Sequence, residues 1–259
     1  MLLLASFFSL LCLLGVAVLQ KKLHLLWQSS IHQLFHASLL GILNPFIYYL
    51  ILFRAYNLLP AQIAQPLNYT WAIVLALLSI FIQKQKLKYS DFIAIAICYG
   101  GVTVISSGGG KLGEIDKFGV FLALVSSLAW AFYWIYNVSI RLDPLIKLIA
   151  NFTTGTVLIL IYCLISGNLP VLSYQGILSS LYTGFFEMGL TFVFWLKAME
   201  LTEKTVHISN LIFLSPFASF LIINITLKEP IAWTSILGLA MIISGILFQH
   251  SHTRKINKL

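Results

Sequence analysis

The stretch ILSSLYTGFFEMGLTFVFWL, residues 177–196, decides the class of this protein because a single acid interrupts a long apolar run. Glu187 lies about ten residues before Lys197, which is roughly 15 Å of helix and half the thickness of a bilayer core. A charged carboxylate at that depth costs several kcal/mol and usually serves a function. Since Glu187 alone among the 8 acids is set deep in an apolar run, the sequence predicts a membrane protein with a polar site inside the membrane.

Composition extends this prediction to the whole chain. Of 259 residues, 59% are hydrophobic and 9% are charged, and the mean hydropathy is +0.94. A soluble domain carries about 25% charged residues, so this composition excludes one. Since a backbone in lipid must satisfy its own hydrogen bonds, we predict an all-α integral membrane protein with about nine transmembrane helices. The predicted spans are residues 1–19, 33–56, 61–83, 91–107, 117–140, 144–166, 174–197, 203–227 and 231–249.

The net charge of +8 is explained by membrane topology, and we expect no nucleic-acid partner. Of the 16 Lys and Arg residues, 12 fall on one side of the predicted spans and 4 on the other. Cytoplasmic loops carry the excess of basic residues. We therefore expect a multi-pass protein of a bacterial or archaeal inner (plasma) membrane, with a cytoplasmic C-terminus and basic tail at residues 251–259.

The chain also contains an internal repeat. GILNPFIYYLILFRA, residues 41–55, aligns with GFFEMGLTFVFWLKA, residues 184–198, at a shift of 143, which pairs Asn44 with Glu187. The equivalent helices are the second and the seventh predicted spans, so they cross the membrane in opposite directions. An inverted-topology repeat is typical of secondary transporters, whose substrate site lies at the repeat interface near the midplane. Chance similarity between Leu-rich helices is the alternative interpretation.

A Gly-rich polar segment, SSGGGKLGEIDK at residues 106–117, separates the two predicted halves. The first half covers residues 1–107 with four predicted helices, and the second covers residues 117–250 with five. In the first half, Pro45 follows Asn44 and cannot donate a backbone hydrogen bond, so we expect the helix to be loosened there.

Polar residues form a second set of candidates. At a shift of 142, Gln65 pairs with His207 and Asn68 pairs with Asn210. Each helix thus carries two polar side chains at i, i+3 on one face. They are candidates for a ring of donors and acceptors around a polar substrate, alongside Glu187. Interhelical hydrogen bonding that only holds the bundle is the alternative.

Aromatic residues and missing motifs complete the candidate site. Trp130, Tyr133 and Trp134 share one helical face, where they either stack on a substrate or form an interfacial aromatic belt. No phosphate loop, Cys-x-x-Cys or His-Glu-x-x-His pattern occurs. We therefore predict no catalytic residue, no metal and no cofactor.

Three segments resemble a known family: FRAYNLLPAQIAQPLNYTW at 53–71, WLKAMELTEKTVHISNLIFLSPF at 195–217 and LKEP at 227–230. They resemble the drug/metabolite transporter superfamily, in its EamA-like branch of ten-helix exporters. The resemblance implies gradient-driven export of small organic metabolites, such as amino acids, by alternating access. Because only four predicted helices precede the central segment, we expect the family's first helix to be missing, through either a start upstream of Met1 or a shortened chain.

Other functions remain as alternatives. A non-transporting or degenerate membrane subunit fits the missing helix, and a membrane-embedded enzyme fits less well because the acids do not cluster. The expected partners are a small-molecule substrate and the lipid bilayer, with a homodimer as a further expectation.

The basic asymmetry makes topology testable. A reporter fused after Leu259 should read cytoplasmic, and a reporter inserted at Gly109 should read external, because the positively charged loops stay inside. Alkaline phosphatase and fluorescent-protein fusions measure both positions. A cytoplasmic signal at Gly109 would contradict the predicted helix count and the repeat together.

Overall fold

The computed structural model describes residues 1–59, 64, 67–86, 88–107, 116–203, 205–215 and 233–256. All regular structure in these ranges is helical, which confirms the predicted all-α membrane class. Five helical stretches are long and apolar enough to cross a bilayer: Leu2–Leu19, Ile31–Leu58, Lys117–Ser139, Pro144–Ile165 and Tyr174–Leu201. Three shorter apolar helices are Leu67–Phe81, Tyr89–Val104 and Ile236–Phe248. Much of the predicted span 203–227 lies outside the described residues.

The chain forms two compact units, each drawn from both ends of the sequence. Unit 1 consists of Met1–Leu50 and Phe132–Leu201, and unit 2 consists of Ile51–Ala131 and Thr202–Leu259. Each unit therefore takes helices from both predicted halves. The division into sequence halves and their inverted relation stay predictions.

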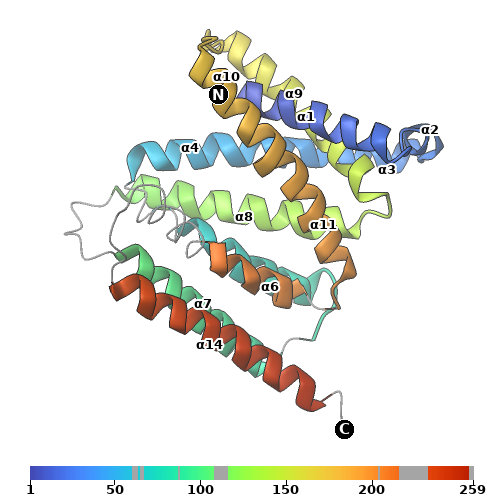
Figure 1. Ribbon diagram of the computed structural model, residues 1–259. Helices are drawn as coiled ribbons and strands as arrows, with labels where there is room; N and C mark the ends of the chain where they lie inside the picture. The colour runs from blue at the N-terminus through green and yellow to red at the C-terminus, as the bar shows by residue number, and fades with distance from the viewer. Residues whose placement is uncertain are drawn as a thin grey trace. The chain divides into compact units, whose positions relative to one another are not determined.

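Unit 1 is a bundle of helices with two π-helical segments. Its elements are α1 (Leu2–Leu19), α2 (His24–Gln28), α3 (Ile31–Gly41), η1 (Ile42–Ile47), α9 (Pro144–Ile165), α10 (Tyr174–Tyr182), η2 (Thr183–Leu190) and α11 (Thr191–Leu201). Helix α1 packs against η2, α9 and α10, while α3 packs against α9 (Figure 1). α4 (Tyr48–Leu58) begins in unit 1, and α8 (Lys117–Ser139) ends there.

Small residues permit the close helix packing in unit 1. A side-chain carbon at Gly184 would lie 2.5 Å from the Ala5 carbonyl oxygen of α1. A side-chain carbon at Gly41 would clash with the Asn151 carbonyl of α9. Glycine at these positions lets backbones approach more closely than any other residue allows, as is common where membrane helices associate.

Unit 2 contains α6 (Trp71–Phe81), α7 (Tyr89–Ser107), α12 (Thr205–Leu211), the short 3-10 helix η3 (Ile212–Leu214) and α14 (Trp233–Ile256). Helices α7 and α14 lie side by side along much of their length (Figure 1). Gly101 of α7 sits directly against the Gly238 backbone of α14, because a side-chain carbon there would lie 2.6 Å from the Gly238 oxygen. This contact uses the same small-residue packing as unit 1.

Two of the long predicted helices are interrupted where the repeat alignment pairs them. Asn44 in η1 has φ −146° and ψ 125°, an extended conformation that kinks the chain between α3 and α4. A residue before proline is pushed out of the helical region, so Pro45 explains the kink. Glu187 lies in η2, a wider turn in which the Phe186 carbonyl accepts from the Thr191 backbone N–H and also, at 2.5 Å, from Thr191 Oγ1. π-helical insertions occur frequently at functional sites.

The packing of α1 on η2 predicts a sharp difference between two glycines. Gly184→Ala places its methyl group against backbone atoms of Ala5 and Ser9 that cannot rotate away, so it should lower the free energy of unfolding by about 1–3 kcal/mol. Gly15→Ala meets nothing within 4 Å and should leave stability unchanged or slightly raise it. Thermal unfolding in detergent measures both. Equal stability of the two variants would contradict the packing described here.

Candidate functional site

Glu187 lies beside a cluster of buried tyrosines in unit 1. Its carboxylate interacts electrostatically with Tyr49, which also neighbours Tyr48 and Tyr133. Tyr48 and Tyr49 are each 5% exposed, and their ring centroids lie 4.9 Å apart in an edge-to-face arrangement. Glu187 itself is exposed, although the sequence placed it deep in the membrane-spanning run. The site therefore places one exposed carboxylate beside a buried cluster of tyrosines.

Asn44, the predicted partner of Glu187 in the repeat, is fully buried in the same unit. The Tyr133 hydroxyl faces the Asn44 and Asn137 side chains and donates a 3.4 Å hydrogen bond to Asn151 Oδ1. The Asn44 amide interacts with the Tyr133 hydroxyl and makes no other hydrogen bond to a described residue. A buried amide whose donors and acceptor are not all engaged is costly, and such groups at kinks call for an explanation.

Trp134 belongs to the packed interior of unit 1. It is 1% exposed, and its ring meets those of Phe192 and Trp195 edge to face, at centroid distances of 5.2 Å and 6.3 Å. Tyr133 is fully buried beside it. These contacts favour a packing role for Trp134 in the conformation seen here, because its ring faces protein on several sides.

The other predicted residues belong to unit 2. Asn68 donates a 3.1 Å hydrogen bond to Ser126 Oγ, which matches the bundle-holding alternative. His207 Nε2 lies 3.8 Å from the buried Asp91 carboxylate, and Asn210 is 1% exposed. Trp130 packs edge to face on Trp71, with ring centroids 6.3 Å apart.

The structure thus groups four of the nine candidates in unit 1 and four in unit 2. The unit 1 candidates are Asn44, Tyr133, Trp134 and Glu187. Gln65 lies outside the described residues. The substrate-binding roles assigned from the sequence stay predictions for all of them.

Lys147 is a buried charge that the sequence analysis did not single out. It lies in the first turns of α9, has no exposed side-chain surface and forms an ion pair with Glu200 at the end of α11. It also donates hydrogen bonds to the carbonyls of Asn137 and Ile140, at 2.9 Å and 3.2 Å. These carbonyls end α8, where the helix dipole favours a cation, so Lys147 holds α8, α9 and α11 together.

A sequence signal for Lys147 existed. Asp143 and Pro144 mark a helix start, and Asp143 does cap α9 by accepting a 3.0 Å hydrogen bond from Leu145 N. That start places Lys147 near a helix N-terminus, where a cation is unfavourable unless it serves another element. The second oxygen of Asp143 pairs with Lys22 Nζ at 2.8 Å, so two ion pairs stand at this end of unit 1.

No metal centre emerges from the described residues. They contain no group of three or more His, Cys, Asp or Glu side chains placed to hold an ion. The polar group beside Glu187 is the Tyr49 hydroxyl, which suits hydrogen bonding to an organic molecule.

Comparisons with known proteins give a consistent picture. The model described as "EamA-like transporter family" matches residues 1–107 and 117–249. An uncharacterized transporter of Clostridium kluyveri is 26% identical over 86% of this chain and 74% of that protein. The uncharacterized transporter YvbV of Bacillus subtilis is 24% identical over 93% of this chain and 79% of its own length. An uncharacterized transporter of Archaeoglobus fulgidus is 24% identical over 80% and 74% of the two chains.

One solved crystal structure shares the fold. It superposes with a TM-score of 0.80 over 96% of this chain and 88% of its own, at 18% sequence identity. At that identity the likeness concerns the fold alone.

The two ion pairs should contribute very differently to stability. Lys147→Met leaves two carbonyls and the Glu200 carboxylate without their donor, so it should cost about 3 kcal/mol of unfolding free energy. Lys22→Met breaks a pair whose side chains are 35% and 20% exposed, so it should cost less than about 1 kcal/mol. Denaturant titration of the detergent-solubilised protein measures both. A Lys147→Met variant as stable as Lys22→Met would contradict the role of Lys147 in holding α8, α9 and α11 together.

Proposed function

This chain belongs to the EamA-like transporter family, and we propose that it exports small organic metabolites, with amino acids as the leading class, by alternating access. The family match, the related transporters and the apolar helices make it a multi-pass membrane transporter. Export, the substrate class and the mechanism are our proposals. A bacterial or archaeal plasma membrane with the C-terminus inside fits the basic asymmetry, and a homodimer stays an expectation.

The observation that carries the proposal is an exposed carboxylate inside a membrane-spanning stretch. Glu187 lies within Tyr174–Leu201, one of the five long apolar stretches, and the residue is exposed. Hydrocarbon does not solvate a carboxylate, so such a group faces a water-filled path, a ligand or both. A transport site supplies all of these.

The neighbours of Glu187 suit a zwitterion with an apolar side chain. An ammonium group needs an acceptor, which the exposed Glu187 carboxylate beside the buried Tyr49 provides. A carboxylate needs a donor, and we propose the Asn44 amide nitrogen, which carries a second N–H beyond its contact with the Tyr133 hydroxyl. An α-amino acid carries both groups, which supports amino acids over purely anionic substrates.

The interruptions in the long helices support alternating access. The kink at Asn44 and the wide turn around Glu187 break the regular helical hydrogen bonding on both elements that carry the site. Discontinuous helices are characteristic of transporter sites, because they free backbone groups and allow two rigid parts to move about them. The energy source in this proposal is an ion gradient, with Glu187 as the group that exchanges a proton for the substrate's ammonium.

The decisive variant is Glu187→Gln, which keeps size and hydrogen bonding but removes the charge. Proteoliposomes carrying an imposed pH gradient, tested with a panel of labelled amino acids and amines, should accumulate substrate only with the native residue. Loss of the charged hydrogen bond should weaken amine binding by roughly tenfold or more. Glu203→Gln removes the same charge from an exposed turn after α11 and serves as the matched control.

The outcomes separate two roles of Glu187. If it couples protons, Glu187→Gln abolishes accumulation driven by pH. If it only binds the ammonium, the variant loses affinity for amines but keeps exchange that does not depend on pH. A folded Glu187→Gln protein with native rate, affinity and pH profile would contradict both roles.

A further inference from the structure

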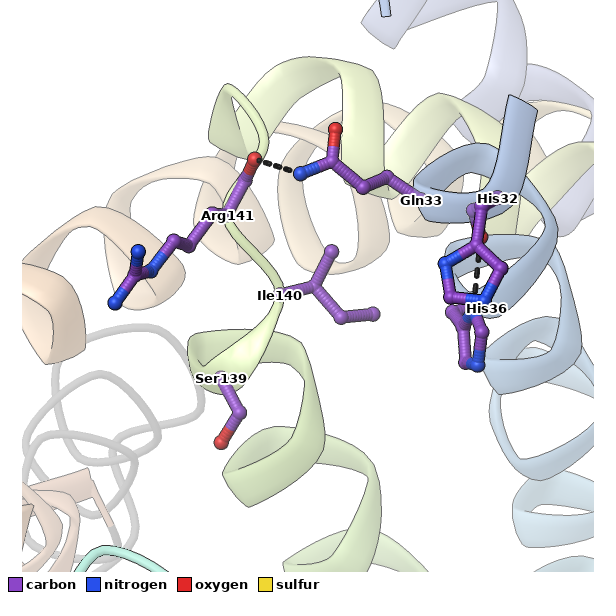
Figure 2. Close-up of a pocket in the computed structure, with 6 residues that line it drawn as sticks. All are labelled: His32, Gln33, His36, Ser139, Ile140 and Arg141. Carbon is purple, nitrogen blue, oxygen red and sulfur yellow. Dashed lines mark hydrogen bonds between the residues drawn. The ribbon is translucent and has the colours of Figure 1, made fainter. Parts of the chain in front are cut away.

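A shallow pocket of about 280 Å³ lies at one end of unit 1, away from the residues around Glu187. It is lined by His32, Gln33, His36, Ser139, Ile140 and Arg141. Figure 2 shows the Ile140 side chain between Arg141 on one side and the two imidazoles on the other. Gln33 bridges the elements by donating a 3.1 Å hydrogen bond to the Arg141 carbonyl, which ties α3 to the turn after α8.

The pocket has an excess of positive charge. Unit 1 contains three acids, of which two are already paired. Asp143 in the α8–α9 turn pairs with Lys22, and Glu200 at the end of α11 pairs with Lys147. Arg141 forms no ion pair with any described residue, and no acid lines the pocket. Arginine stays charged and its planar group suits phosphate oxygens. The charge therefore complements an anion.

The imidazoles add directed donors. The His36 Nδ1 lies 2.7 Å from the His32 carbonyl, and since a carbonyl only accepts, this nitrogen donates inside the helix. The His32 ring makes no hydrogen bond to the described residues, so its N–H is available to a ligand. Both rings are exposed and lie on successive turns of α3, with centroids 4.3 Å apart and planes tilted by 55°.

The surroundings of the pocket match the membrane–water interface. Leu19 at the end of α1, Trp27 in α2 and Ile31 at the start of α3 are 85%, 91% and 82% exposed. Exposed tryptophan beside basic residues is typical of the headgroup level. From His32 the same face of α3 continues through Phe35 to Leu39, at i, i+3 and i+7, and both apolar side chains are exposed.

We propose that this pocket binds the headgroup of an anionic phospholipid, with its negative charge shared by Arg141 and His32 on either side of the Ile140 side chain and the acyl chains along Phe35 and Leu39. The exposed Phe35 and Leu39 side chains on the same helix face distinguish a lipid from a soluble phosphate. Acyl chains can pack against these side chains, whereas a free anion makes no apolar contact with them. On the proposed topology the pocket faces the inner leaflet. Anionic lipids attract basic protein segments at that surface.

The test uses the full chain in detergent, titrated with phosphatidylglycerol or phosphatidylcholine, with retained lipid counted by native mass spectrometry. The native protein should retain phosphatidylglycerol in preference to phosphatidylcholine. Arg141→Gln should weaken phosphatidylglycerol retention about fivefold, the effect of one basic residue near a membrane surface. Lys117→Gln removes the same charge from the exposed start of α8, the helix whose other end precedes Arg141, and should leave retention unchanged.

Two further measurements keep the proposal open to refutation. Phe35→Ser should weaken lipid retention without altering the basic groups, and circular dichroism should show each variant folded. Equal losses for Arg141→Gln and Lys117→Gln would assign the effect to overall charge and overturn the site. Displacement of phosphatidylglycerol by millimolar inorganic phosphate, with no effect of Phe35→Ser, would identify a site for a soluble anion and overturn the lipid.

Discussion

The absence of a hydrogen-bonding solvent in the bilayer core is the constraint on which the polar interior of unit 1 depends. Each buried polar group there must find its partner within the bundle. Asn151 donates to the Ala37 carbonyl at 2.9 Å and accepts from Tyr133, and Asn137 donates to the Tyr133 carbonyl at 3.2 Å. Lys147 in turn donates to the Asn137 carbonyl. These contacts connect the buried ion pair of Lys147 with Tyr133, which belongs to the buried tyrosine cluster beside Glu187.

Against that background, Asn44 and Glu187 are exceptions with the same origin. Both lie where regular helix is lost, Asn44 at a kink before Pro45 and Glu187 in the wide turn of η2. Asn44 is buried with hydrogen-bonding capacity that the described residues fill only in part, whereas Glu187 is exposed in the middle of a spanning stretch. Polar groups that lack protein partners inside a membrane are tolerated where a ligand or water completes their hydrogen bonding. We therefore propose that this pair serves the function of the protein.

The sequence predicted the fold class correctly because composition and run length leave no alternative for a chain this apolar. It also singled out Asn44 and Glu187 as candidates, since polar residues stand out in apolar helices, and their roles stay predictions. It did not predict that Trp134 is packed on Phe192, because helical periodicity shows which face a residue shares but not what covers that face. Nor did it reveal that Lys147 holds α8, α9 and α11 together, because these contacts join residues far apart in the chain.

The central claim is that Glu187 lies at the substrate site, and chemical protection tests it most directly. A hydrophobic carbodiimide reacts with carboxyl groups in apolar surroundings and marks them with a stable adduct that peptide mass spectrometry locates. We expect labelling of Glu187 in the detergent-solubilised protein, and we expect a transported amino acid or amine to suppress it in proportion to its affinity. Labelling of Glu187 that no transported substrate reduces, even at saturating concentration, would contradict the account.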